Sequence, residues 1–416
     1  MLLLKSKWIR ALLGCVILLM ISGCELTMDP KSLMKTPELS VDRENIKSVI
    51  TAQLPEGSTI IRPRDATNTS SIRITDLNHD GINETVVFYE TPDDTVRIHG
   101  MILEKKGNTW MKQLTFDGEG IVLESFELKD VTNDGKIDIV AGYSSGDDEL
   151  QKGLVVYTYN GKTLDKELEL PYTKFVLDDL NGDKINDISV ISLKRNEYAS
   201  VTVYQYDSGF KELDKLQLDP YVNEFYNVVS GNVAKNRKGL ILDTSVGTHS
   251  AYSHVIVMEN QKLIDVLPQD QTFKDYQTYS GDVNGDGILE LGLLETPKGW
   301  EYVSFDEIPW LFSYYQWDGE SGLKFVMQQY RDLKGRFYFN FPKEWYNKVT
   351  VDPKSNKDQY LKFVIYDTGE TVAEIQFFSL SQWERVKSNW EMIARDNDKV
   401  IGFRSSKELK LGTTDK

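Results

Sequence analysis

The sequence contains few of the residues on which catalytic and redox sites usually depend. Its 416 residues include two cysteines and four histidines. Both cysteines, Cys15 and Cys24, lie near the start of the sequence, so the rest of the chain has no thiol for a disulfide, a zinc cluster or a nucleophile. A phosphate-binding glycine loop, HExxH, CxxC and the Gly-x-Ser-x-Gly turn of serine hydrolases are also missing. The sequence therefore assigns no catalytic residue and no cofactor-binding residue.

Histidine, serine and aspartate gather in a single stretch. His249, Ser253 and His254 follow Asp243 within one short segment. A hydrolytic Ser-His-Asp arrangement needs its serine on a constrained turn and an oxyanion hole. Because the sequence indicates neither, we expect a polar loop here, and catalysis is the weaker alternative.

Negative charge is in excess. The chain has 64 acidic and 48 basic residues, which gives a formal net charge of −16 at pH 7. An excess of this size argues against nucleic acid or anionic lipid as a partner, because both repel an acidic protein. It is compatible with cation binding, although a solvated acidic surface would account for most of it.

The first residues have the features of an export signal. Lys5, Lys7 and Arg10 precede an apolar run over 11–21, which is too short to remain in a bilayer as a spanning helix. Residues 21–24, Ile-Ser-Gly-Cys, resemble the lipobox of bacterial lipoproteins, in which the cysteine is diacylated and becomes the first residue after cleavage. A membrane anchor or a plain secretory signal is the alternative.

The lipobox resemblance implies where the mature protein is located. Residues 1–23 would be the signal peptide, Cys24 would carry the acyl chains, including palmitate, and 24–43 would be a tether. Two acyl chains give stable anchoring where one is marginal. The expected location is the extracytoplasmic face of the cell membrane. A short helix over 40–54, with Ser40 as N-cap and Pro55 as its end, is expected to follow.

A nine-residue acidic loop recurs along the chain, starting at Asp76, Asp130, Asp179 and Asp282. Each copy has oxygen-bearing side chains at positions 1, 3, 5 and 9 and a backbone carbonyl available at position 7, which suits a hard cation of the size of calcium. Position 12 is apolar in every copy, so these are not helix–loop–helix calcium sites, which need a glutamate there. Such Asp- and Asn-rich loops also favour turns without metal, and this alternative stays open.

Each loop is followed by a short β-rich apolar run, and this combination resembles the FG-GAP/VCBS repeats, in which the loop joins the first two strands of a β-propeller blade. The resemblance implies structural calcium. Lys184 stands at position 6 of the third loop, where glycine belongs, and must adopt a left-handed conformation or distort the turn. The implied metal ligands are Asp76, Asn78, Asp80 and Glu84; Asp130, Thr132, Asp134 and Asp138; Asp179, Asn181, Asp183 and Asp187; and Asp282, Asn284, Asp286 and Glu290.

The loops define a repeat of about 50 residues. Their starting positions, 76, 130, 179 and 282, leave a double interval before the last copy. Residues 230–243 fill this gap with a strand-like run that has lost the carboxylates. A second signature, a strand that ends in a tight turn, follows each loop start by about 30 residues. Its copies are 102–107, 155–161, 201–209, 255–260 and 314–319.

Repeats of this size, with four strands each, are typical of propeller blades. We therefore predict a mainly β fold, with a β-propeller of about five four-stranded blades over 44–331. A sixth blade, partly built from 55–70, or an open β-solenoid are the alternatives.

The repeat stops after Tyr330, and residues 332–416 are expected to form a small α+β domain. Expected strands are an alternating aromatic strand from Gly335 that Pro342 ends, and 348–351, 361–366, 372–378 and 400–403, with a helix over 379–395. The aromatic opening of this segment resembles small domains of Firmicute-type surface lipoproteins. Its aromatic side chains are expected in the core, and a ligand platform is the alternative.

Together these features favour a lipid-anchored extracytoplasmic binding or scaffold protein. A wall glycan, a peptide or another protein could dock on the propeller. The alternative is a hydrolase or lyase of envelope polymers that uses carboxylates in the propeller channel. Paired Asp or Glu side chains pointing into a pocket would favour the enzyme.

Overall fold

The computed structural model describes residues 41–64, 70–91, 95–146, 150 and 152–412. The chain divides into two compact units. The first consists of 1–54 and 106–111, and the second of 55–105 and 112–416. The predicted signal peptide, Cys24 and the tether up to residue 40 lie outside the described residues. None of the helices in the described ranges is long and apolar enough to cross a membrane.

The described part of the first unit contains helix α3, Val41–Gln53. Ile46 and Ile50, one turn apart on this helix, are fully buried. The helix ends shortly before Pro55, which disfavours helical backbone at the residue before it. The predicted helix over 40–54 is thus confirmed, while its proposed cap, Ser40, lies outside the described residues.

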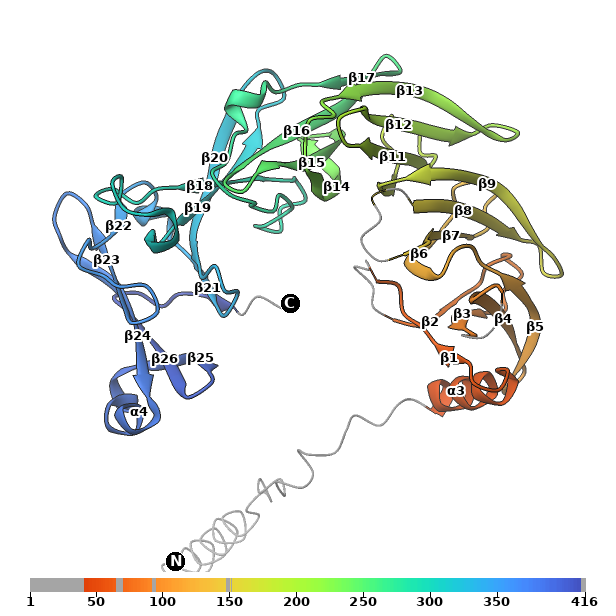
Figure 1. Cartoon of the computed structure of the whole chain (residues 1–416), viewed down its shortest axis with the longest axis horizontal. Coiled ribbons are helices and arrows are strands. Elements are labelled where there is room, and N and C mark those ends of the chain that lie inside the picture. Colours follow the sequence, from red (N-terminus) through yellow and green to blue (C-terminus); the bar gives the residue numbers. More distant parts are fainter. Residues whose placement is uncertain (1–40, 65–69, 92–94, 147–149, 151, 413–416) are drawn as a thin grey trace, which may run out of the picture. The chain divides into compact units, whose positions relative to one another are not determined.

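The second unit consists mainly of antiparallel sheets that follow one another along the sequence (Figure 1). We number them sheet 1 to sheet 6. In sheets 2, 3 and 4, four consecutive strands pair in sequence order. Sheet 1 contains β1 Thr59–Ile60, β2 Ile72–Thr75, β3 Glu84–Glu90, β4 Ile98–Lys106 and β5 Thr109–Asp117. Sheet 2 contains β6 Val122–Lys129, β7 Asp138–Ser144, β8 Lys152–Tyr159 and β9 Leu164–Tyr172.

The next two sheets repeat this meander. Sheet 3 contains β10 Lys174–Asp178, β11 Asp187–Lys194, β12 Tyr198–Tyr206 and β13 Phe210–Leu218. Sheet 4 contains β14 Glu224–Ala234, β15 Arg237–Gly247, β16 Ser250–Glu259 and β17 Lys262–Asp265. The 3-10 turns η1 Gln269–Gln271 and η2 Phe305–Glu307 lie before and after the first strand of sheet 5.

Sheets 5 and 6 are built from the last third of the chain. Sheet 5 contains β18 Leu291–Glu295, β19 Leu311–Trp317, β20 Leu323–Arg331, β21 Tyr338–Asn340 and β27 Leu411–Gly412. Sheet 6 contains β22 Val349–Val351, β23 Tyr360–Ile365, β24 Thr371–Ser379, β26 Lys399–Ser405 and β25 Glu391–Asp396. The remaining elements are η3 Lys343–Trp345, α4 Leu380–Val386 and η4 Lys387–Asn389.

The apolar runs of the sequence become strands that are buried on both faces. β7 is buried along its entire length, and β3 along all but its last residue. One apolar cluster contains side chains of sheets 1 and 2, and further clusters join sheets 2 and 3, 3 and 4, 4 and 5, and 5 and 6. The fourth strand β9 instead alternates between exposed and partly buried positions. A mainly β fold with several four-stranded antiparallel sheets is therefore confirmed.

The aromatic stretch after residue 331 lies in the core. Phe337, Phe339, Phe341 and Trp345 are each at most 3% exposed, as expected for core residues. Phe339 packs edge-on against Phe363 of sheet 6, with ring centroids 5.3 Å apart. Only Tyr338–Asn340 forms a strand, and β21 pairs with β20 and β27 in sheet 5. Part of the segment predicted as a C-terminal domain thus completes a sheet begun before residue 331, and the domain boundary itself stays a prediction.

The helix predicted over 379–395 is wrong in its second half. Helix α4 ends at Val386, and residues 391–396 form strand β25, which pairs with β26. A tight turn between these strands places Asn397 at φ 53°, a conformation that asparagine tolerates better than most residues. The apolar residues with helical spacing remain close together, since Trp383 and Trp390 both pack against Phe378.

The packing of sheets 5 and 6 predicts a large effect of one core substitution. Phe339→Ala removes a fully buried ring and should lower the free energy of unfolding by about 3–5 kcal/mol. Tyr302→Ala, at a fully exposed position, should change it by no more than about 0.5 kcal/mol. Urea-induced unfolding of both variants measures the difference. Equal stability of the two variants would contradict the described core.

Candidate metal centres and ligand cavity

The acidic loops occupy the same place in successive sheets. Residues 76–84 connect β2 to β3, 130–138 connect β6 to β7, and 179–187 connect β10 to β11. The loop at 282–290 lies between the antiparallel bridge of Gly281 with Glu290 and strand β18. The loops in sheets 2 and 3 therefore join the first two strands, as the repeat pattern predicts, and the loop in sheet 1 likewise joins the adjacent strands β2 and β3. The fourth loop precedes β18, and the bridge of Gly281 with Glu290 stands where a preceding strand would pair. In sheet 4 the same connection is the short turn between β14 and β15, so the run at 230–243 keeps its strands and lacks the loop.

A shared set of backbone hydrogen bonds shapes the loops. The aspartate at position 1 accepts the N–H of the residue at position 6, as in the bond from Gly287 to Asp282 Oδ2 of 3.0 Å. The aspartate at position 5 accepts the N–H at position 7, as in the bond from Ile288 to Asp286 Oδ1 of 2.9 Å. Lys184 makes the same position-6 bond to Asp179, at φ 73°. The third loop thus keeps the common turn despite its lysine.

The residue at position 9 is a buried carboxylate in every loop. Glu84, Asp138, Asp187 and Glu290 have no exposed surface. Each accepts the backbone N–H of position 2 at 2.7–2.9 Å. These bonds hold the end of each loop against its beginning, so the carboxylate is a structural part of the turn.

Burial makes the charge of these carboxylates costly. It raises the pKa of Glu290 to about 7 even though the N–H of Val283 donates to it, and repulsion by Asp286 and Asp282 adds to the shift. Burial likewise raises the pKa of Glu84 to about 7 and that of Asp187 to about 6. The second oxygen of Glu84, Oε1, is buried and has no hydrogen-bond partner among the described residues. A cation at these loops would supply the missing positive charge.

The loops differ in how far their carboxylates converge. In the fourth loop, one oxygen each of Asp282, Asp286 and Glu290 lies within 4.8 Å of the others. Within the described ranges this is the one such group of three His, Cys, Asp or Glu side chains. In the second loop, Lys136 Nζ donates to Asp134 Oδ2 at 2.8 Å, so this oxygen is already engaged. A calcium ion requires several oxygen ligands around one point, and among the described loops the fourth is the one in which three carboxylates converge.

In the second, third and fourth loops, the strand paired with the one that follows the loop adds a polar side chain that the sequence patterns did not assign to the loops. Gln316 Nε2 donates to Asp286 Oδ2 at 3.0 Å and to Glu290 Oε1 at 2.7 Å. Gln205 makes the equivalent bonds to the third loop, and Thr158 donates to Asp138 in the second. These residues occupy one position of the second sequence signature, just before its aromatic residue and tight turn. Their shared position in this signature was the sequence feature from which their role at the loops could have been predicted.

The histidine–serine–aspartate stretch does not form a triad. Ser253 donates to Asp243 Oδ1 at 2.6 Å, whereas His254 Nδ1 lies 2.6 Å from Asp265 Oδ2. The ring of His249 instead packs against Phe305, with centroids 4.2 Å apart. No catalytic unit is therefore assembled from these residues, and β15 and β16 hold most of them in strands instead of the expected loop.

Asp243 is the centre of a buried ion pair. Lys274 Nζ lies 2.7 Å from Asp243 Oδ1, and neither side chain is exposed. Burial alone would raise the pKa of Asp243, but the Lys274 ammonium and the donors around it hold that pKa below its usual range. Ser280 donates both its N–H and its hydroxyl to the same carboxylate at 2.7 Å. The pair thus fastens the segment before the fourth acidic loop to sheet 4.

This ion pair predicts an asymmetric double-mutant cycle. Asp243→Asn leaves the Lys274 charge buried without its partner and should lower the free energy of unfolding by about 3–5 kcal/mol. Adding Lys274→Met should recover part of the loss. The exposed pair of Asp207 and Lys211 serves as the control, because its removal should cost no more than about 1 kcal/mol. Urea-induced unfolding of the variants measures these changes. A loss of no more than about 1 kcal/mol in Asp243→Asn, as for the exposed pair, would contradict the described burial.

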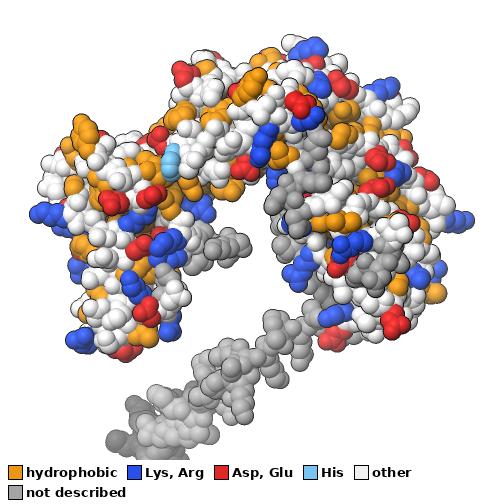
Figure 2. Space-filling model, viewed as in Figure 1, with side chains coloured by type: hydrophobic (Ala, Val, Ile, Leu, Met, Phe, Trp, Pro, Cys, Tyr) orange, Lys and Arg blue, Asp and Glu red, His pale blue; other side chains and the backbone are white. Residues whose placement is uncertain are grey.

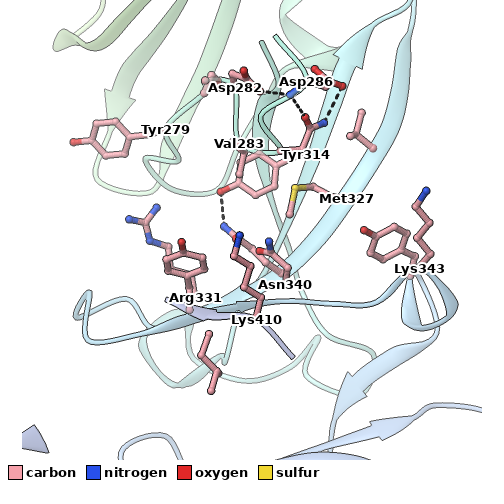
Figure 3. Close-up of a pocket in the computed structure, with 18 residues that line it drawn as sticks. Tyr279, Asp282, Val283, Asp286, Tyr314, Met327, Arg331, Asn340, Lys343 and Lys410 are labelled. Atoms are coloured by element: carbon pink, nitrogen blue, oxygen red, sulfur yellow. Dashed lines mark hydrogen bonds between the residues drawn. The ribbon is translucent and has the colours of Figure 1, made fainter. Parts of the chain in front are cut away.

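A cavity of about 900 Å³ adjoins the fourth acidic loop (Figure 3). Asp282 and Asp286 lie at one end of it in the figure, and Arg331, Lys343 and Lys410 lie away from them. A second cavity of about 580 Å³ is bordered by residues of β6, β10 and β14 and shares Tyr279 with the first. The first is lined by Tyr279, Ser280, Gly281, Asp282, Val283, Asn284, Asp286, Tyr314, Val326, Met327, Gln329, Arg331, Tyr338, Asn340, Lys343, Tyr346, Lys410 and Leu411.

The surface charge does not point to a single extended patch. On the face shown in Figure 2, Lys and Arg side chains are interspersed with Asp and Glu. The net charge of −16 is therefore not gathered in one region of that face. The acidic loops and the cavity beside the fourth loop remain the features with a specific arrangement.

Comparison with known proteins gives only distant similarity. No protein-family model and no curated protein matches the chain. Among solved structures, the rhamnogalacturonan lyase YesW has 13% identity and a TM-score of 0.35, over 74% of this chain and 69% of that one. The Bacillus licheniformis rhamnogalacturonan lyase PL11 has 12% identity and a TM-score of 0.35, over 77% of this chain and 64% of that one. The β-propeller domain of the Trilobed protease from Pyrococcus furiosus has 11% identity and a TM-score of 0.31, over 73% of this chain and 82% of that domain.

One of these structural neighbours is a β-propeller domain. Identities and TM-scores this low give no indication of what the chain binds or which reaction it performs.

Proposed function

We propose that this chain is a calcium-stabilised β-propeller that acts as a binding protein at the cell envelope, anchored to the membrane by lipid on Cys24. The observation that carries the proposal is the repeated loop with its buried ninth carboxylate. A side chain that costs free energy to ionise recurs at the same place in four sheets. Such repetition suits a structural ion in each unit better than an independent function of each loop.

In this proposal sheets 1 to 5 are the blades of one propeller, and sheet 6 is the centre of the C-terminal domain. The sixteen loop residues named from the sequence are the calcium ligands, and the fourth loop is the best-formed site. Calcium binds through oxygen atoms at 2.3–2.6 Å, and exposed extracellular sites of this kind typically have dissociation constants of about 10⁻⁴–10⁻³ M. Metal binding would fasten the first strand of each blade to the second.

A binding role is favoured over catalysis by the chemistry of the larger cavity. Its only carboxylates among the described residues are Asp282 and Asp286, and both accept backbone hydrogen bonds within the loop. Although burial alone would raise it, the pKa of Asp286 lies below its usual range because Gln316 and the N–H of Ile288 donate to it. A general acid at neutral pH needs a raised pKa. A hydrolase or lyase would have to use Asp282 and Asp286, which the loop already holds through backbone hydrogen bonds.

Calcium should raise the thermal stability of residues 25–416. A site with a dissociation constant of about 10⁻⁴ M, held at 100-fold excess of free calcium, adds about 2.7 kcal/mol to the free energy of unfolding. We expect the unfolding midpoint to rise by several degrees in millimolar calcium relative to chelator, measured by circular dichroism. Magnesium should have a smaller effect, because it requires stricter octahedral geometry.

Two pairs of substitutions test whether the loops cause this shift. Asp282→Asn with Glu290→Gln should reduce the calcium-dependent rise, because it removes two of the converging carboxylates. Asp367→Asn with Glu370→Gln removes the same charge from exposed positions and should leave the rise unchanged. Identical curves in calcium and chelator for the unmodified chain would end the proposal of structural calcium.

The membrane anchor has its own test. Cys24→Ser should move the protein from the detergent phase to the aqueous phase in a detergent partition experiment, since it removes the site of acylation. Cys15→Ser lies in the predicted signal peptide and should leave partition unchanged. Metabolic labelling with palmitate follows the modification directly. A labelled Cys24→Ser protein would contradict the proposed lipidation.

A further inference from the structure

Three basic side chains border the cavity of about 900 Å³ beside the fourth acidic loop. Arg331 comes from the end of β20, Lys343 from η3, and Lys410 from the residue before β27. In the described part of the chain, none of the three forms an ion pair. They come from three separate elements of a chain with net charge −16, and the fold places all three around one cavity.

The rest of the lining can hold a polar molecule with ring faces. Tyr279, Tyr338 and Tyr346 offer aromatic faces and hydroxyl groups, and Tyr279 is 56% exposed. Asn340 also borders the cavity, although its Oδ1 is buried away from solvent. The volume lies at the upper end of the roughly 300–1,000 Å³ that small-molecule sites occupy.

We propose that this cavity binds an acidic oligosaccharide. Arg331, Lys343 and Lys410 pair with its carboxylate or phosphate groups, and the tyrosines pack against its rings. Tyr279 also borders the second cavity, so a longer ligand can continue past it. The inference rests on the proposed function only in treating the chain as a binding protein, and it does not require calcium.

An acidic peptide fits this site less well. Extended peptides commonly bind by adding a strand to a free sheet edge. The edge strand of sheet 5 in this region, β27, is two residues long and so offers few backbone groups for such pairing. A saccharide needs no strand edge, because its hydroxyls and acidic groups bond to side chains.

The test is isothermal titration of the chain over residues 25–416 with defined probes. A uronic acid trisaccharide and a phosphorylated trisaccharide carry the charge on carboxylate and phosphate, and a neutral trisaccharide is the reference. At least one acidic probe should bind more tightly than the neutral one and more weakly as salt increases. Which of the two binds identifies the acidic group.

Matched variants locate the binding site. Lys343→Gln with Lys410→Gln should weaken binding of the acidic probe by about tenfold or more, because charged hydrogen bonds are lost. Lys354→Gln with Lys399→Gln removes the same charge from exposed positions outside the cavity and should have no effect. Tyr279→Ala should also weaken binding, although it changes no charge.

Four results would overturn the proposal. These are failure of both acidic probes to bind, equal affinity for the neutral probe, equal effects of the two lysine pairs, or tighter binding of an acidic peptide at the same residues. Thermal unfolding of the same samples in calcium and in chelator tests the proposed function separately. Loss of saccharide binding with an intact calcium effect would refute this inference alone.

Discussion

The balance of charge at the buried ninth position of each acidic loop is the constraint on which the proposed architecture depends. Glu84 and Glu290 have pKa values raised to about 7 by burial, so their ionised forms are disfavoured in the folded chain. The same carboxylates accept the backbone bonds that close their loops. A divalent cation would turn this cost into a stabilising interaction at the start of strands β3, β7, β11 and β18.

Much of the fold follows from the sequence because two of its patterns coincide. The acidic loops come directly before β3, β7, β11 and β18, and the aromatic turn signature marks the end of the next strand along the chain. Apolar runs such as 139–143 become strands buried on both faces, since each sheet packs against its neighbours. Even the degenerate unit at 230–243 is identified, because its strands persist after its carboxylates are lost.

Other features depend on contacts that a linear pattern does not contain. Trp383 and Trp390 have helical spacing, yet the tight turn at Asn397 makes the second half of that segment a strand. Strand β27 pairs with β21 across about 70 residues, Leu411 opposite Phe339, and no local signal predicts this register. Gln316 reaches the fourth loop only because its strand lies opposite Glu290. The basic residues of the larger cavity likewise meet through the fold alone.

We propose separate roles for the acidic loops and the cavity. Calcium in the loops would hold the sheets, while the cavity beside the fourth loop would select an acidic ligand. The most direct test of the central claim is anomalous diffraction from crystals grown in millimolar calcium. We expect an anomalous peak for a calcium ion that Asp282, Asp286 and Glu290 coordinate. Peaks in the other loops should be weaker where the affinity of the loop for calcium is lower. Well-ordered loops without any anomalous peak at that concentration would contradict the central claim.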